Sequence, residues 1–544
     1  MRIAFLSLDG RVRQWHLSAV RAAALACEAG SPVKLELMVL PSTHARRQDE
    51  GVWPLVRAVE QRLLGPRRSL WQRITLDGEG GIACRPESPE IVAGCSDTDL
   101  PDLLLDCTGL EDAQSWAARA RLGLLRVRFG AGFDETGIDR ALVQSRPWLC
   151  ISVELVTPDL NRPLETTVMS LTKSRSFSRA RESAARRSRL LLMRAIKRLH
   201  EERGGPAAAA ADATPIELET PSRRDTPTPL SASQALAMLI RNGFGLAAHT
   251  ARSALLRLDH WFLAYRTQQD KFIANRFEMS AEGMKVFCLD PARFHADPCV
   301  FEHEGVDHVF FEEFCYKKKK GVISWSQLQA DGTLSPPSVV LEEPTHLSYP
   351  FVFSYQGAVY MMPETTRQRE IALYEELSFP RRWRKATVLF HNIAASDATL
   401  HVHDDHWWMF VNIRHDGFTG SDELFLFYAR NPFGPWTEHA QNPIKSDVRS
   451  ARSAGRLFYH GDRLIRPAQD RSGSYGGALL LCQVQELTTA SYREAVIKRL
   501  DPDWLAGNSG FHTLSFSNRL EVIDGKFDLP RWRAPARDGL ALGA

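Results

Sequence analysis

The sequence lacks the features that mark several classes of protein. Its nine cysteines form no Cys-x-x-Cys pair, which argues against a disulfide framework and against a zinc site. No apolar run reaches the ~18 residues needed to cross a bilayer. The 68 basic and 65 acidic residues nearly cancel, to a net charge of +3, so charge does not predict a nucleic-acid partner. We therefore expect a cytoplasmic protein of two or three domains.

A dinucleotide fingerprint is also missing from the first 150 residues. Strand patterns at 3–8, 33–40 and 101–109 alternate with helical patterns at 14–29 and 113–122, which predicts a small doubly wound α/β sheet. The turn Asp9-Gly10-Arg11 after the first strand lacks the further glycines of Gly-x-Gly-x-x-Gly. We therefore expect an α/β module at 1–150 that holds no cofactor.

The next hundred residues are predicted to connect two domains. Residues 151–203 contain a basic helix with an apolar stripe. This helix is either a connector with a solvated basic face or a peripheral contact with an anionic membrane. Residues 204–230 have the Ala, Pro, Ser and Thr content of a disordered linker, and residues 231–258 return to helix.

The rest of the chain repeats one plan of short strands. A strand that opens with a polar residue is followed by a turn and a second, aromatic-rich strand. The repeats align at Val300, Val352, Leu400, Leu457 and Ser515, at spacings of 52, 48, 57 and 58 residues. A period near 50 with several strands per unit predicts a five-bladed β-propeller at 259–530, followed by a tail at 531–544. The extra strand Trp261–Arg266 is expected to pair with Leu520–Asp524, closing the ring.

Carboxylates recur at positions that should face the centre of this propeller. Asp297 and Asp397 stand at the same repeat position in blades one and three, so we expect them to face each other across the axis. Paired carboxylates are what glycosyl chemistry uses, although each Asp could instead cap a local turn. Glu312 and Glu364 end second strands and are candidates for a general acid with a raised pKa, the alternative being a rim salt bridge.

Further polar residues crowd the later blades and suit recognition of a sugar or a phosphate. The predicted substrate-binding set is Arg452, Arg466, Gln469, Asp470, Tyr475 and His512, together with Glu312. The cluster from His401 to His406 falls at a hairpin turn and is interpreted as a turn, so no metal is predicted.

Several motifs of the propeller resemble a known domain. They are His346-Leu347-Ser348-Tyr349-Pro350, Met362-Pro363-Glu364-Thr365, Asn431-Pro432-Phe433-Gly434-Pro435-Trp436 and Arg466-Pro467-Ala468-Gln469-Asp470. Together they resemble the domain found N-terminal in plant glucosamine inositolphosphorylceramide transferases, over residues 259–527. That domain is similar to the five-bladed arabinanase and fructosidase clan of glycoside hydrolases. The resemblance implies that Asp297 is a catalytic base and that Asp397 tunes it.

The first module resembles formyltransferases in layout. Its strand at 102–106 and the segment 121–130 carry the likeness. Arg126-Val127-Arg128-Phe129-Gly130 stands where formyltransferases have His-Pro-Ser-Leu-Leu-Pro, so we expect a module without formyl transfer.

Two functions are consistent with these residues. One is a carbohydrate-active enzyme that acts on a glycan, a sugar nucleotide or a glycolipid headgroup by glycosyl transfer or hydrolysis, with Asp297, Asp397 and Glu364 in catalysis. The other is a non-catalytic glycan-binding or scaffold protein. The acid that the hydrolase clan carries in blade four has no clear match here, and the chain ends soon after the fifth repeat, without the catalytic domain that follows in the plant enzymes.

Overall fold

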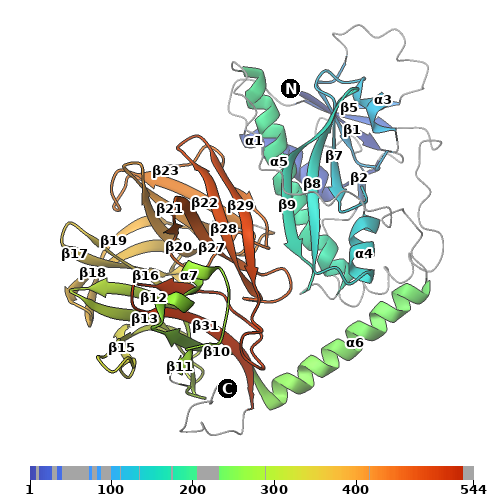
Figure 1. Cartoon of the computed structure of the whole chain (residues 1–544). Helices are drawn as coiled ribbons and strands as arrows, with labels where there is room; N and C mark the ends of the chain where they lie inside the picture. The colour runs from blue at the N-terminus through green and yellow to red at the C-terminus, as the bar shows by residue number, and fades with distance from the viewer. Residues whose placement is uncertain are drawn as a thin grey trace. The chain divides into compact units, whose positions relative to one another are not determined.

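The computed structural model describes residues 1–7, 11–26, 34–39, 73–75, 83–86, 100–110, 112–133, 135–172, 176–204, 232–287, 289–415 and 417–530. It divides into two compact units (Figure 1). One comprises Met1–Phe244 with Asp416–Phe418, and the other comprises Gly245–His415 with Thr419–Ala544. The predicted tail at 531–544 and all but the first residue of the predicted linker at 204–230 lie outside the described residues.

The first unit is built on a seven-stranded sheet of order β5-β3-β1-β6-β7-β8-β9. The strands from β5 to β7 run parallel, whereas β8 and β9 are antiparallel. The predicted α/β alternation is therefore present, and the likeness to a formyltransferase stays a prediction. The elements are β1 (Arg2–Ser7), β2 (Arg11–Arg13), α1 (Gln14–Ala26), β3 (Lys34–Val39), β4 (Arg73–Thr75), β5 (Ala83–Pro86), β6 (Leu103–Asp106), α3 (Ala113–Ala117), β7 (Leu124–Phe129), α4 (Glu135–Val143), β8 (Trp148–Val156), β9 (Asn161–Ser170) and α5 (Phe177–Gly204).

The region 151–203 differs from the predicted connector. Most of β8 and all of β9 lie beyond residue 150, and they extend the sheet instead of leaving it. Helix α5 buries Leu191, Leu192 and Ile196 in the same core as Phe5 of β1. Because its apolar stripe is covered by the sheet, α5 is a core helix with a basic outer face. A membrane contact through α5 stays a prediction, but its apolar side is not available for one.

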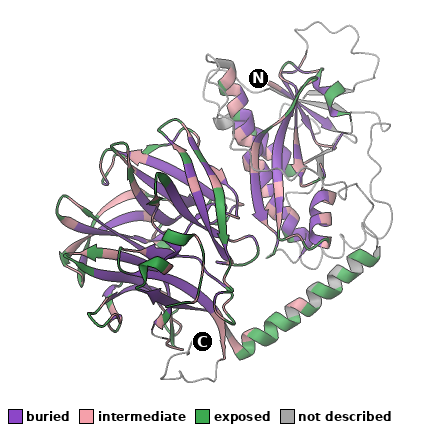
Figure 2. Ribbon diagram, in the orientation of Figure 1, coloured by how far each residue is buried: buried purple, intermediate pink, exposed green. Residues whose placement is uncertain are grey.

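The second unit is a propeller of five sheets, as predicted from the repeat (Figure 1). The chain enters it from α6 (Ala232–Leu255). Buried side chains fill the spaces between neighbouring sheets, and exposed residues gather at turns and outer edges (Figure 2). The blades are β12 (Arg293–His303), β13 (Val306–Cys315), β14 (Lys320–Gln327) and β15 (Ser338–Leu341); β16 (Ser348–Tyr355), β17 (Ala358–Glu364), β18 (Glu370–Ser378) and β19 (Arg382–His391); β20 (Ala395–His403), β21 (His406–Ile413), β22 (Glu423–Ala429), β23 (Thr437–Glu438) and β24 (Lys445–Ser446); β25 (Arg452–Ser453), β26 (Phe458–His460), β27 (Arg463–Asp470), β28 (Ala478–Leu487) and β29 (Tyr492–Leu500); and β30 (Leu514–Phe516), β31 (Glu521–Pro530), β10 (Leu256–Arg266) and β11 (Lys285–Phe287).

The fifth blade joins the two ends of the propeller. Strand β10 pairs antiparallel with β31, and the register sets Leu263 opposite Asp524 and Arg266 opposite Glu521. The predicted closure is confirmed. A fully buried ion pair reinforces it, because Arg266 Nε donates to Glu521 Oε1 at 2.8 Å and both side chains are 0% exposed.

Candidate active site

The inner strands of the first three blades each carry a bulge at one equivalent point. The strand register shifts between Ala296 and Cys299, between Ser348 and Phe351, and between Ser396 and Thr399. Inside the bulges, Asp297, Tyr349 and Asp397 adopt left-handed φ angles of 52°, 42° and 50°. This conformation is costly for residues other than glycine, and bulges of this kind often re-aim side chains beside active sites. The equivalence of Asp297 and Asp397 predicted from the repeat is therefore present in the backbone.

The bulges of blades one and two open onto a common space. A small pocket is lined by residues of four blades, among them Asp297, Tyr349, Gly455 and Ser515. Tyr349 crosses between blades, because its hydroxyl lies 2.8 Å from Thr399 Oγ1 and accepts a hydrogen bond from the Gly455 N–H at 3.0 Å. Tyr349 was not predicted as a site residue, although it lies three residues before Val352, as Asp297 lies three before Val300.

Asp397 belongs to a buried cluster of charges around Arg452. The Arg452 guanidinium holds Asp397 through two hydrogen bonds, of which Nη2 to Oδ1 is 2.9 Å. It also donates from Nη2 to Glu364 Oε2 at 3.2 Å. Gln469 Nε2 donates to Asp397 Oδ2 at 3.3 Å. Burial raises the pKa of Asp397 to about 6; Arg452 opposes this rise and the carboxylate of Glu364 adds to it.

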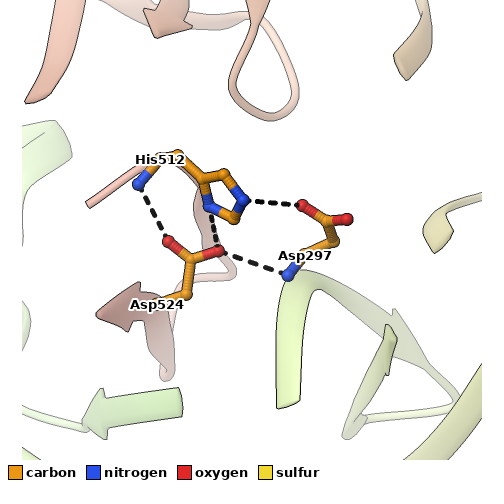
Figure 3. Close-up of side chains that lie close together, drawn as sticks. All are labelled: Asp297, His512 and Asp524. Carbon is orange, nitrogen blue, oxygen red and sulfur yellow. Dashed lines mark hydrogen bonds and ion pairs between the residues drawn. The ribbon is translucent and has the colours of Figure 1, made fainter. Parts of the chain in front are cut away.

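Asp297 belongs to a second cluster, which contains a histidine between two carboxylates (Figure 3). His512 Nδ1 lies 2.5 Å from Asp524 Oδ2, and His512 Nε2 lies 3.6 Å from Asp297 Oδ1. Thr513 Oγ1 donates to Asp297 Oδ1 at 3.3 Å. Burial raises the pKa of Asp297 to about 6, His512 lowers it, and Asp397 and Asp524 raise it further. The charge of Asp397 therefore influences Asp297, so the two clusters form one site.

His512 binds a proton more readily in this arrangement than an ordinary histidine does. Burial acts to lower its pKa, but Asp524, Asp297 and Asp397 together outweigh burial and raise it. Ligand atoms of Asp297, His512 and Asp524 lie within 4.8 Å of one another and could hold a metal ion. An imidazolium has no free lone pair, so a metal would first have to displace its proton. The geometry favours an ion-paired histidine.

Glu312 is the fourth carboxyl of the group. It lies in β13 and its Oε1 is 3.5 Å from His346 Nε2. Burial raises its pKa well above the usual value, and the negative charges of Asp297, Glu364 and Asp397 raise it further. Burial and charge therefore favour the protonated form of Glu312.

Aromatic rings back this group of charges. Trp261, from the closing strand β10, stacks on the His512 ring at 3.9 Å. The Tyr475 ring meets His512 edge to face at 5.4 Å, and Arg471 lies over Tyr475 at 3.9 Å. Burial lowers the pKa of Arg471 to about 10, with Tyr475 opposing and Arg452 adding to the decrease. Arg471 was missed, although it follows the quoted motif directly; Asp524 and Trp261 were predicted only as parts of strands.

Two predicted residues belong elsewhere. Arg466 donates from Nε to Glu494 Oε2 and from Nη2 to Glu494 Oε1, both at 2.7 Å, inside blade four. Asp470 pairs with Arg499. These partners correct the expectation that Arg466 and Asp470 join the substrate-binding set. The remaining predicted residues are brought together, namely Asp297, Glu312, Glu364, Asp397, Arg452, Gln469, Tyr475 and His512.

Comparison with known proteins gives one family and a set of distant folds. Residues 279–503 match the family model "Glucosamine inositolphosphorylceramide transferase 1, N-terminal". The protein of that name from Oryza sativa subsp. japonica is 37% identical over 212 residues, which cover 38% of this chain and 28% of the rice protein. The Arabidopsis thaliana protein is 32% identical over the same length, with the same two coverages.

Two solved structures show how distant the similar folds are. Zg3597, a family 117 glycoside hydrolase from Zobellia galactanivorans, has a TM-score of 0.32 and 10% identity, covering 45% of this chain and 88% of its own. The Bombyx mori GH32 β-fructofuranosidase has a TM-score of 0.31 and 14% identity, covering 44% of this chain and 56% of its own.

The family match covers only part of the site. Asp297, Asp397 and Arg452 lie inside the matched residues 279–503, whereas His512 and Asp524 lie beyond them. The chain spans about a quarter (28%) of the length of the curated relatives it matches. Most of the propeller is therefore similar to the N-terminal region of glucosamine inositolphosphorylceramide transferases, as its motifs predicted.

Proposed function

We propose that the centre of the propeller binds a saccharide and catalyses glycosyl transfer or hydrolysis. The observation that carries the proposal is the convergence of four carboxyl groups, Asp297, Glu312, Glu364 and Asp397, the last two of which contact the guanidinium of Arg452. Buried carboxyls cost free energy unless they are paired, so a fold does not gather four of them for stability alone. Carboxyls with raised pKa values are the acids and bases of glycosyl chemistry.

The environments of these carboxyls suggest separate roles. Glu312, whose pKa is raised well above the usual value, would protonate the leaving oxygen of the glycosidic bond. Asp297, with a pKa of about 6, would accept the proton of the attacking hydroxyl. The pair formed by Asp397 and Arg452 would position Glu364 and set the local charge. This proposal moves Glu364 from the acid role expected from sequence, because Arg452 holds it as an ion-pair partner.

The substrate class is proposed from the relatives. Their name, glucosamine inositolphosphorylceramide transferase, joins a sugar to a lipid whose inositol headgroup is a polyhydroxylated ring. We propose a glycolipid headgroup or a related glycan as the ligand of this propeller. The planar side chains of Gln469 and Arg471 and the ring of Tyr475 suit hydroxyl and ring-face contacts with such a group.

The test compares matched variants of the full chain on a panel of glycolipids and glycans, with products followed by mass spectrometry. Asp297→Asn and Glu312→Gln should each lower turnover by roughly 100-fold or more. Asp470 lies outside the cluster of four carboxyls, so Asp470→Asn should leave turnover unchanged. The rate should rise as the pH increases through about 6, because Asp297 ionises there. Asp297→Asn should remove this rise from the pH–rate profile. Full activity in Asp297→Asn would refute the catalytic assignment.

A non-catalytic glycan-binding protein is the second candidate. It is favoured by the burial of Asp297, which is 7% exposed and already contacts Thr513 and His512. In that case calorimetric titration would detect glycan binding that Asp297→Asn preserves, and no glycan in the panel would yield a product.

A further inference from the structure

Helix α6 presents an apolar face to solvent. Ile240, Phe244 and Leu255 are 50%, 73% and 56% exposed, and Ala247 and Ala251 are exposed between them. The positions 240, 244, 247, 251 and 255 repeat at three or four residues, so they lie along one side of the helix. A helix on a protein surface usually turns such a face toward a core. Here the face is available to a partner.

The charges of α6 are all of one sign. Between Ala232 and Leu255 the helix has Arg241, Arg252 and His249 and no aspartate or glutamate. Both arginines lie on one side of the apolar face, roughly 80–100° around the helix from its centre. Arg252 pairs with Asp528, yet its side chain is 65% exposed. A basic helix with an apolar face fits a surface that is apolar inside and negatively charged outside.

The sequence of α6 also indicates that its partner supplies stability. Gly243 and Gly245 stand on either side of Phe244, near the middle of the helix. Glycine is among the poorest helix-forming residues, because it loses the most backbone entropy on folding. Burial of the apolar face would offset this cost. Of the helices in the described part of the chain, none is long and apolar enough to cross a membrane, so α6 would lie along a bilayer surface.

We propose that α6 is an interfacial membrane helix, which inserts Ile240, Phe244 and Leu255 among the acyl chains of an anionic bilayer with Arg241 at the level of the headgroups. The proposal places a membrane contact on α6, whereas the contact predicted from sequence lies on α5, whose apolar side is buried. The inference is independent of the proposed catalysis, because it concerns a helix outside the propeller.

The test measures binding of the full chain to vesicles by co-sedimentation. Vesicles of phosphatidylcholine and phosphatidylglycerol at about 3:1 should bind the protein, and phosphatidylcholine alone should bind it more weakly. The double variant Ile240→Ser, Phe244→Ser should bind roughly tenfold or more weakly. Val402→Ser removes an apolar side chain of similar exposure, 52%, from β20 and should bind as the parent does. Arg241→Gln should lose about fivefold on anionic vesicles only.

Hydrogen exchange separates the alternatives. On anionic vesicles the amides of 232–255 should gain protection, and circular dichroism should show that the variants keep the parent's fold. The proposal is overturned if protection appears at 177–204 instead, or if the double variant binds as tightly as the parent. It is also overturned if light scattering without lipid shows a dimer that the double variant abolishes, since the apolar face would then cover a second copy of the chain.

Discussion

Removal of the Arg452 guanidinium should destabilise the propeller in a way that depends on pH. In Arg452→Gln, Asp397 and Glu364 lose the cation that each contacts. Arg452 and Asp397 are 7% and 2% exposed, so water replaces little of the lost interaction. Breaking a buried ion pair from one side costs roughly 3–5 kcal/mol when the remaining charge is ionised.

The sign of the pH effect follows from the folded-state pKa of Asp397, which is raised to about 6 from the usual 3.8. A carboxyl with a raised pKa binds its proton more tightly in the folded state, so its contribution to stability is lost as pH rises through that value. Without Arg452 the pKa would rise further. At about pH 8 the variant should therefore lose the full ~3–5 kcal/mol, and at about pH 5, where Asp397 is protonated, only ~1–3 kcal/mol for lost hydrogen bonds.

Urea denaturation at both pH values, followed by tryptophan fluorescence, measures the difference. Arg499→Gln is the matched control, because Arg499 also pairs with aspartates but is 48% exposed. It should cost less than about 1 kcal/mol at either pH. If Arg452→Gln lost the same free energy of unfolding at pH 5 and pH 8, the buried charges would not be coupled as described.

Two other variants test the closure and the centre of the ring. Arg266→Met should lose about 3–5 kcal/mol, because Glu521 stays buried without its partner, whereas the double variant Arg266→Met, Glu521→Leu should recover most of this loss; equal melting temperatures for single and double variants would contradict the pairing. Tyr349→Phe should cost about 1–3 kcal/mol, because the Gly455 N–H loses its acceptor. A urea midpoint equal to the parent's would show that this bond is not formed.

The repeat in the sequence predicted much of the propeller because every blade is built from the same pattern of strands and packs against its neighbours in the same way. The alternation of short apolar strands set the number of blades, and the unpaired strand at Trp261 implied the closure. Register also predicted that Asp297 and Asp397 are equivalent, since one alignment fixes every inner strand. Asp297 lies three residues before the aligned Val300. The residues three before the aligned Val352 and Ser515 are Tyr349 and His512.

Side chains that bond across blades were harder to predict. Asp524 lies in the second strand of blade five, yet its Oδ2 accepts a hydrogen bond from the backbone N–H of Asp297 in blade one at 3.2 Å. Such contacts depend on the packing between blades, which the local sequence does not determine. Arg466 was predicted to bind substrate because it is a polar residue in a strand. The same pattern arises when the arginine pairs with a buried carboxylate, here Glu494. The position of helix α5 was not predicted, because an apolar stripe on a helix rich in arginine is consistent with a solvated connector as well as with a core helix.

The pairing of β10 with β31 imposes an order on folding during synthesis. Arg266 meets Glu521, which leaves the ribosome 255 residues later. At translation rates of about 5–20 residues per second, this delay is roughly 13–50 s. The first four blades are contiguous in sequence and can form locally, whereas blade five must close a long loop. During that interval β11 can pair with one edge of β10, while the edge that later pairs with β31 stays exposed. We expect a chaperone to protect this exposed edge in the nascent chain.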